Sequence, residues 1–206
     1  LEMNYANIRR LMVWLQNSKH YNGFDSRGNE LQNKKETGID ITFPISNLIS
    51  IRSKGKIKSY LVESTVSNLR NRNSLGWWND FRLQMRLNES VDFDLGLLLG
   101  EEQGIQKDTD FMANAVGLTF LGKILFKNVG RLQTGMNYVK VREQQNIGYL
   151  PPETFEGYPI GLSFRTNSRF TYSINKTISV VLSINTIDDE RYDNFISFQG
   201  EVRAYF

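Results

Sequence analysis

Apolar and polar residues alternate with a period of two along most of this chain. The segment 81–99 is the clearest case, since apolar residues occupy every second position from Phe81 to Leu87 and again from Val91 to Leu99. Successive side chains of a β-strand point to opposite faces, so this period is typical of strands with one apolar and one polar face. The pattern therefore predicts an all-β fold.

Ten segments carry the alternation. They are 4–16, 39–51, 60–66, 81–87, 91–99, 112–126, 132–140, 158–174, 178–184 and 195–206. The length fits one domain, residues 1–206, with consecutive strands antiparallel in an up-and-down order. Residues 1–16 are ambiguous, because Tyr5, Ile8 and Leu15 also fit one stripe of a helix, so this part is predicted as either the first strand or a short helix.

The predicted connections alternate between short and long. The short ones lie near 53–56, 88–90, 128–130 and 175–177, and the longer polar ones at 17–36, 71–77, 101–110, 143–156 and 188–193. Successive connections of an up-and-down sheet lie at opposite ends of the strands. The lengths therefore predict tight turns at one end and long loops at the other.

The last strand adds a family signature. Every second position up to the final aromatic is apolar or small, namely Phe198, Gly200, Val202, Ala204 and Phe206. This ending resembles the C-terminal strand of bacterial outer-membrane β-barrel proteins, in which the terminal Phe and the alternate apolar positions form the signal that the insertion machinery reads. The loop asymmetry is also that of such barrels, with tight periplasmic turns and longer external loops.

The resemblance implies an antiparallel up-and-down transmembrane β-barrel of about ten strands, or the C-terminal part of a larger barrel. It implies a location in the outer membrane of a Gram-negative bacterium, exposed at the cell surface. The implied partners are membrane lipid, the barrel-insertion machinery and other outer-membrane or surface proteins.

Alternation alone does not say which face is buried. A soluble β-domain places the apolar face inside, whereas a membrane barrel turns it toward lipid and lines its lumen with polar side chains. In the membrane interpretation, the charges predicted to face the lumen are Arg82, Arg86, Asp92, Asp94, Arg165, Glu201 and Arg203. The hairpin at 88–90 is predicted to place Arg86 opposite Asp92 and Gln84 opposite Asp94, and the opposite charges of Arg86 and Asp92 stabilise the pairing of the strands.

Aromatic residues lie near the predicted strand ends. Amphipathic rings favour the headgroup layer of a membrane, so these residues are predicted to form interfacial girdles. The candidates are Trp77, Trp78, Tyr158 and Phe206.

Composition restricts the chemistry. The chain has no cysteine and a single histidine, His20, which excludes disulfides and thiolate metal sites and argues against a histidine metal centre. His20 lies in a predicted loop, and no second catalytic constellation accompanies it. No stretch reaches the about 18 apolar residues of a membrane helix. The net charge of +3 is spread along the chain, which gives no support to nucleic-acid binding.

These observations predict a protein with no catalytic residues, metal or cofactor. The expected role is that of a membrane anchor that displays surface loops, or of part of a larger outer-membrane assembly. A narrow, porin-like channel is a further form of the same interpretation, although side chains largely fill the lumen of so small a barrel. The alternative is a soluble all-β binding module with an apolar interior and aromatic-lined ligand loops.

Overall fold

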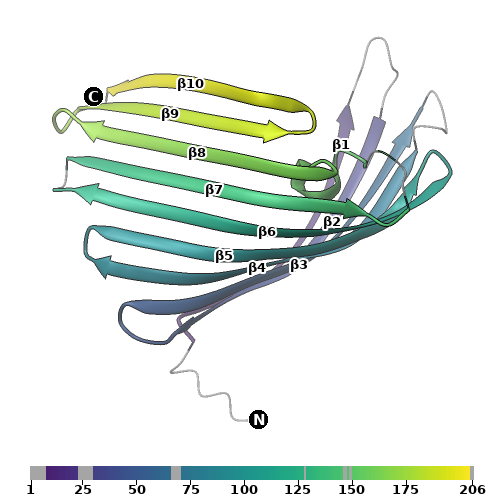
Figure 1. Ribbon diagram of the computed structural model, residues 1–206, viewed down its shortest axis with the longest axis horizontal. Helices are drawn as coiled ribbons and strands as arrows, with labels where there is room; N and C mark the ends of the chain where they lie inside the picture. Colours follow the sequence, from purple (N-terminus) through teal and green to yellow (C-terminus); the bar gives the residue numbers. More distant parts are fainter. Residues whose placement is uncertain are drawn as a thin grey trace.

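The computed structural model describes residues 8–22, 30–65, 71–127, 129–145, 148 and 150–204. These residues form ten strands and one short 3₁₀ helix (Figure 1). Their bounds are β1 Arg10–Asn22, β2 Glu30–Pro44, β3 Ile49–Ser64, β4 Arg72–Asn88, β5 Val91–Gln106, β6 Thr109–Phe126, β7 Gly130–Glu143, η3 Thr154–Gly157, β8 Gly161–Ser173, β9 Ile178–Asp189 and β10 Tyr192–Ala204.

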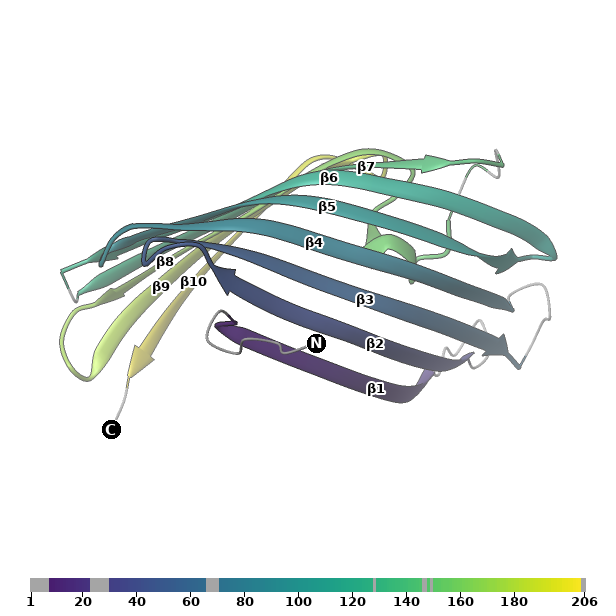
Figure 2. The same ribbon diagram turned by 90° about the horizontal axis from the view of Figure 1, so that it is seen from below.

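All ten strands belong to one antiparallel sheet, in which each strand pairs with its neighbours in sequence. The predicted all-β fold and the up-and-down order are therefore confirmed. The sheet is strongly twisted and curved, and η3 lies on its concave side (Figure 2). In the described part of the chain, β1 and β10 each pair on one side only, so the sheet is open and is not closed into a barrel. Alternation could not show this, because an open sheet and a barrel have the same period.

Within the ambiguous first segment, residues 10–16 belong to a strand. β1 pairs with β2 from Arg10 opposite Thr42 to Asn22 opposite Glu30. The strand begins and ends later than predicted, and residues 1–7 lie outside the described residues. His20 is therefore in a strand, opposite Gln32, and not in a loop as expected.

The first short turn is also in a different place. Lys54 and Gly55, predicted to turn the chain, lie within β3, and the β2–β3 turn occupies 45–48. Pro44 is the last residue of β2, and the Ser46 hydroxyl closes the turn by accepting hydrogen bonds from the backbone N–H groups of Leu48 and Ile49, at 3.2 and 3.1 Å.

Two of the predicted long loops are tight turns. Gln106 pairs with Thr109, so that Lys107 and Asp108 alone connect β5 to β6, both with positive φ. The β9–β10 connection is equally short. The strands continue beyond their apolar residues because backbone pairing does not require apolar side chains. The segment between β7 and β8 remains long.

The two faces of the sheet differ sharply. We call outer face the side that carries Phe81, Leu97 and Leu118, and inner face the concave side that carries Asp40 and Glu102. The outer face is apolar and exposed, and Leu118 is 62% accessible. The inner face is polar, and both of its acidic examples are fully buried. This is the reverse of the usual distribution in water-soluble proteins, where large apolar side chains are mostly inside.

Candidate functional site

The segment before β8 folds back onto the inner face. We call residues 150–160 the inner loop. The ring of Phe155 is fully buried and packs edge-on against Trp78, with 5.6 Å between the ring centroids. Small inward residues of β6, Ala113 and Ala115, leave room for this ring and belong to the same apolar cluster. Side chains of β4 and β6 therefore form the apolar surface against which the loop packs.

A buried ion pair lies beneath the loop. Lys58 Nζ of β3 is 2.6 Å from Glu102 Oε1 of β5, and their side chains are 2% and 0% exposed. The same carboxylate oxygen accepts hydrogen bonds from Trp78 Nε1 at 3.0 Å and from the backbone N–H of Phe155 at 2.9 Å. Glycine at position 76 is required here, because a Cβ would overlap the Glu102 side chain. Glu102 thus connects the inner face of the sheet, which we call the wall, to the inner loop.

Two glutamates of the loop bind cations of the wall. Arg72 of β4 donates two hydrogen bonds to the Glu153 carboxylate, from Nε at 3.0 Å and from Nη2 at 2.5 Å. Glu156 Oε1 lies 2.5 Å from Lys56 Nζ and 3.7 Å from Lys58 Nζ. Arg72 also pairs with Glu30 at 3.2 Å. The loop therefore places two negative charges on a basic part of β3 and β4.

The other side of the loop contacts the far part of the sheet. The Gly157 carbonyl accepts hydrogen bonds from Arg165 of β8 and from Arg191 in the β9–β10 turn, both at 2.7 Å. The buried carboxylate of Asp189 pairs with the same two arginines. The Arg165 guanidinium lies over the ring of Tyr158, 4.0 Å from its centroid. The inner loop consequently bridges the concave face from β3 to β8.

The loop backbone is strained. Phe155, Glu156 and Gly157 all have positive φ, at 46°, 54° and 77°. The left-handed region costs about 1–2 kcal/mol for each residue that carries a Cβ. Such a conformation persists only where the surroundings fix it. Here the Glu102 hydrogen bond and the packing of Phe155 supply that constraint.

The surroundings of the loop shift the pKa values of Glu156 and Tyr158. Burial alone would raise the pKa of Glu156, but the hydrogen bond from Lys56 and the charge of Lys58 outweigh it, and the pKa is lowered from its ordinary value of 4.5. Burial raises the pKa of Tyr158. Glu156 is therefore ionised at neutral pH, as its ion pairs require.

The predicted lumen charges all lie on the inner face, but they do not form one site. The predicted register is confirmed, with Arg86 opposite Asp92 and Gln84 opposite Asp94. Arg86 bonds Asp92 at 3.0 Å and Gln84 bonds Asp94 at 3.2 Å. Three others have partners on their own strand: Arg82 pairs with Asp80, and Glu201 pairs with Arg203 on β10. Only Arg165 contacts the inner loop.

The residues that bind the loop were missed by sequence reasoning. Arg72, Glu102 and Glu153 lie in segments that were predicted to be connections, and Lys58 lies between a predicted turn and a predicted strand, whereas the structure places Lys58, Arg72 and Glu102 within strands. A signal in the sequence is the pair of small residues at the alternate positions Ala113 and Ala115, because small side chains on one face of a strand leave space there. It did not identify Phe155 as the group that fills the space.

The predicted aromatic girdle needs correction. Trp77 is on the outer face and 43% exposed, whereas Trp78 is 4% exposed on the inner face. Adjacent residues of a strand point to opposite faces, so both could not face outward. Tyr158 is buried in the inner loop. Phe206 lies outside the described residues, while Phe198, Gly200, Val202 and Ala204 share the outer face of β10, as predicted.

Comparisons with known proteins give no family. No protein-family model matches the chain, and no curated protein matches it significantly. No helix among the described residues is long and apolar enough to cross a membrane. Those residues also hold no group of three or more His, Cys, Asp or Glu side chains that could bind a metal ion.

Proposed function

We propose that this chain forms the wall of a β-barrel in the bacterial outer membrane. Its role is that of a non-enzymatic anchor that holds loops at the cell surface, alone or within a larger outer-membrane assembly. The observation that carries the proposal is the distribution of side chains, apolar where exposed and charged where buried. An exposed apolar area of this extent indicates an apolar partner, and lipid covers such a surface uniformly.

The height of the apolar area supports this proposal. On β6 the outward residues are apolar or glycine from Val116 to Phe126. These two residues lie about 33 Å apart at about 3.3 Å per residue. For a strand tilted by about 40°, the same span is about 25 Å across the membrane, the height of the apolar band in outer-membrane barrels.

Two pairs of hydroxyl side chains on the outer face lie within hydrogen-bond distance of each other. Thr134 and Ser168 hydroxyls lie 2.8 Å apart, and those of Thr166 and Thr186 lie 2.7 Å apart. A polar group in hydrocarbon is costly only when it lacks a hydrogen-bond partner. These pairs are therefore compatible with contact with lipid.

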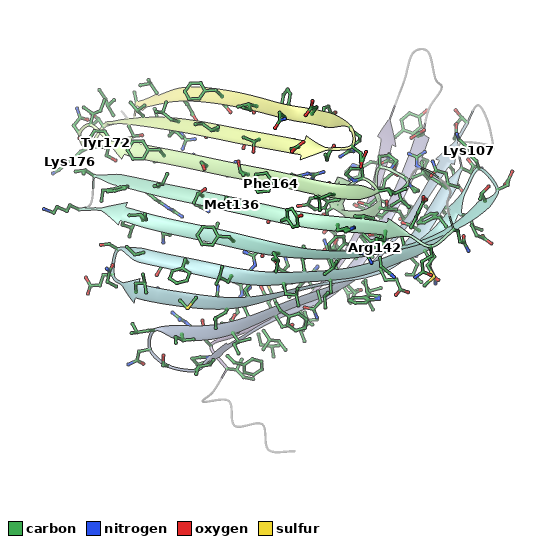
Figure 3. The ribbon with its side chains drawn as sticks, viewed as in Figure 1. Lys107, Met136, Arg142, Phe164, Tyr172 and Lys176 are labelled. Carbon is green, nitrogen blue, oxygen red and sulfur yellow. The ribbon has the colours of Figure 1, made fainter. Side chains whose placement is uncertain are left out.

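Aromatic residues border the apolar area at the end of the sheet that holds the β6–β7 and β8–β9 turns. Phe126, Phe170 and Tyr172 form a connected group, with ring centroids 6.2 and 6.3 Å apart. Figure 3 shows Tyr172 and Lys176 near this end of the sheet, Met136 and Phe164 between the ends, and Arg142 toward the other. Aromatic and cationic side chains at the limits of an apolar band are typical of membrane interfaces.

The proposal requires pairing at the free edges. Unpaired backbone groups of β1 and β10 could not remain unsatisfied in lipid. They would pair with each other or with strands of the larger assembly. The inner loop obstructs the concave face in either arrangement, so anchoring is favoured over free diffusion of solutes.

Tryptophan fluorescence tests the proposal. Trp77 is on the outer face, whereas Trp14 and Trp78 point inward and donate hydrogen bonds to Glu36 and Glu102. In vesicles of lipid brominated on the acyl chains, the bromines should quench Trp77 alone. Quenching should disappear in Trp77→Phe and persist in the matched variant Trp78→Phe. A folded monomer in plain buffer, without quenching by brominated lipid, would show the soluble binding module instead.

A further inference from the structure

We propose that the cations of β3 and β4 under the inner loop form a binding site for small polyanions, which Glu153 and Glu156 occupy in the absence of ligand. The ligand class is a molecule with at least two phosphate or carboxylate groups. The proposal goes beyond membrane anchoring and rests on contacts of the concave face alone.

Apart from the loop, the ion pairs of the concave face contain more cations than carboxylates. Within the described residues, the wall and the β9–β10 turn supply six cations and four carboxylates that form ion pairs around the loop. The excess of two positive charges over the whole concave face equals the two negative charges that the loop brings. One excess charge lies beside Glu153 and Glu156, and the other belongs to Arg165 and Arg191, which bind the Gly157 carbonyl. The cations are Lys34, Lys56, Lys58, Arg72, Arg165 and Arg191, and the carboxylates are Glu30, Glu36, Glu102 and Asp189.

The geometry of the contacts is that of ligand recognition. Arg72 holds Glu153 through two parallel N–H···O bonds, the arrangement by which arginine binds carboxylates and phosphates of ligands. Lys56 binds the second carboxylate at 2.5 Å, with Lys58 at 3.7 Å. A molecule with two oxyanion groups could replace both glutamates without any change in the wall.

A buried hydroxyl without a partner supports the site. Ser74 lies two residues from Arg72 on the inner face of β4 and is 5% exposed. Its Oγ has no hydrogen-bond partner among the residues that the structure describes. A hydroxyl can donate to an oxyanion oxygen, and buried polar atoms are normally satisfied. A ligand that reaches deeper than Glu153 would satisfy it.

The loop is suited to displacement. Phe155 and Glu156 have left-handed backbone conformations that carry strain, and their contacts with the wall maintain those conformations. A ligand that binds Arg72 and Lys56 removes the contact of Glu156 with Lys56 and that of the neighbouring Glu153 with Arg72. Occupation of the site should therefore release the inner loop from the concave face.

Calorimetry with tripolyphosphate tests the site, in the full chain at constant ionic strength. The double variant Glu153→Gln/Glu156→Gln should bind tripolyphosphate about tenfold more tightly than the wild type, or better, because the competing carboxylates are gone. Adding Arg72→Ala to the double variant should abolish the gain. Citrate, measured in parallel, distinguishes phosphate from carboxylate ligands.

The matched control is Asp92→Asn, which removes a carboxylate from the Arg86 pair elsewhere on the inner face. It should leave the affinity unchanged. Equal affinity in wild type and double variant, an absence of binding in both, or an equal gain in the control would each overturn the proposal.

A second measurement uses the wild type and does not depend on the folding of variants. A glutamate-specific protease cleaves after Glu153 and Glu156 only when the loop leaves the wall. Tripolyphosphate should accelerate this cleavage relative to sodium chloride of equal ionic strength, and no acceleration would contradict displacement. Lipid quenching of Trp77 reports membrane contact independently, so the two proposals can fail separately.

Discussion

Side chains on the outer and inner faces of the same strands have opposite environments. Trp77 and Trp78 are neighbours in β4, yet one is exposed among apolar residues and the other is buried with its Nε1–H on Glu102. On the outer face, residues need only be apolar, and their exact shape matters little. On the inner face, each buried charge depends on a particular partner. A change of residue should therefore have different consequences on the two faces.

The largest loss of unfolding free energy is expected from a change at Glu102, on the inner face. Glu102→Ala removes the nearest carboxylate of the buried Lys58, leaves only the more distant Glu156 at 3.7 Å, and frees the Phe155 N–H. The change should destabilise the fold by about 3–5 kcal/mol. Urea unfolding of the membrane-inserted or detergent-bound protein measures the loss.

Replacing both members of this pair is the control. Lys58→Met/Glu102→Leu removes the two charges together and should cost less than Glu102→Ala, because no isolated charge remains. If the double variant were the less stable of the two, the attribution to an unpaired buried lysine would be wrong.

The second effect is expected at Leu118, on the outer face. Leu118→Arg places a charge in the apolar area and should cost about 2–4 kcal/mol if that area lies near the middle of a bilayer. In water the same change at a side chain this exposed would cost almost nothing. The unfolding free energy in vesicles therefore separates the two environments.

Asn114→Arg is the matched control for Leu118→Arg. Asn114 is also exposed on the outer face of β6, beyond the apolar residues and toward the tight turn to β5. Its replacement should cost about 1 kcal/mol or less, as near a membrane interface. Equal effects of the two arginines would refute a boundary between them.

The same contrast explains what the sequence could predict. Alternation is a local property, so the number of strands, their order and the register of Arg86 with Asp92 were all accessible from it. Strand ends were not, because β5 and β6 continue as far as Gln106 and Thr109 through backbone pairing that leaves no apolar pattern.

The candidate site was even harder to predict from the sequence than the strand ends. Glu153 meets Arg72 across 81 positions of the chain, and the contact arises from the curvature of the whole sheet. Neither closure nor curvature is encoded in a period of two. Trp78 was misplaced for a simpler reason, since being next to Trp77 in sequence puts it on the other face of the strand.

The smallest effect is expected from the titration of Glu156, which tests how firmly the loop joins the two sides of the concave face. The pKa of Glu156 is lowered in the folded protein, with its pairing to Lys56 and Lys58 outweighing burial. Its contribution to stability is therefore fully present above its ordinary pKa of 4.5 and is lost as the pH falls below that value.

The side chain of Glu156 is 47% exposed, and solvent screening limits its contribution to about 1 kcal/mol or less. The difference in unfolding free energy between wild type and Glu156→Gln should be largest near neutral pH and approach zero as the pH falls well below 4.5. A difference that stayed constant over this range would show that the carboxylate acts through packing and not through its charge, and the loop would then be held by Phe155 and Glu102 alone.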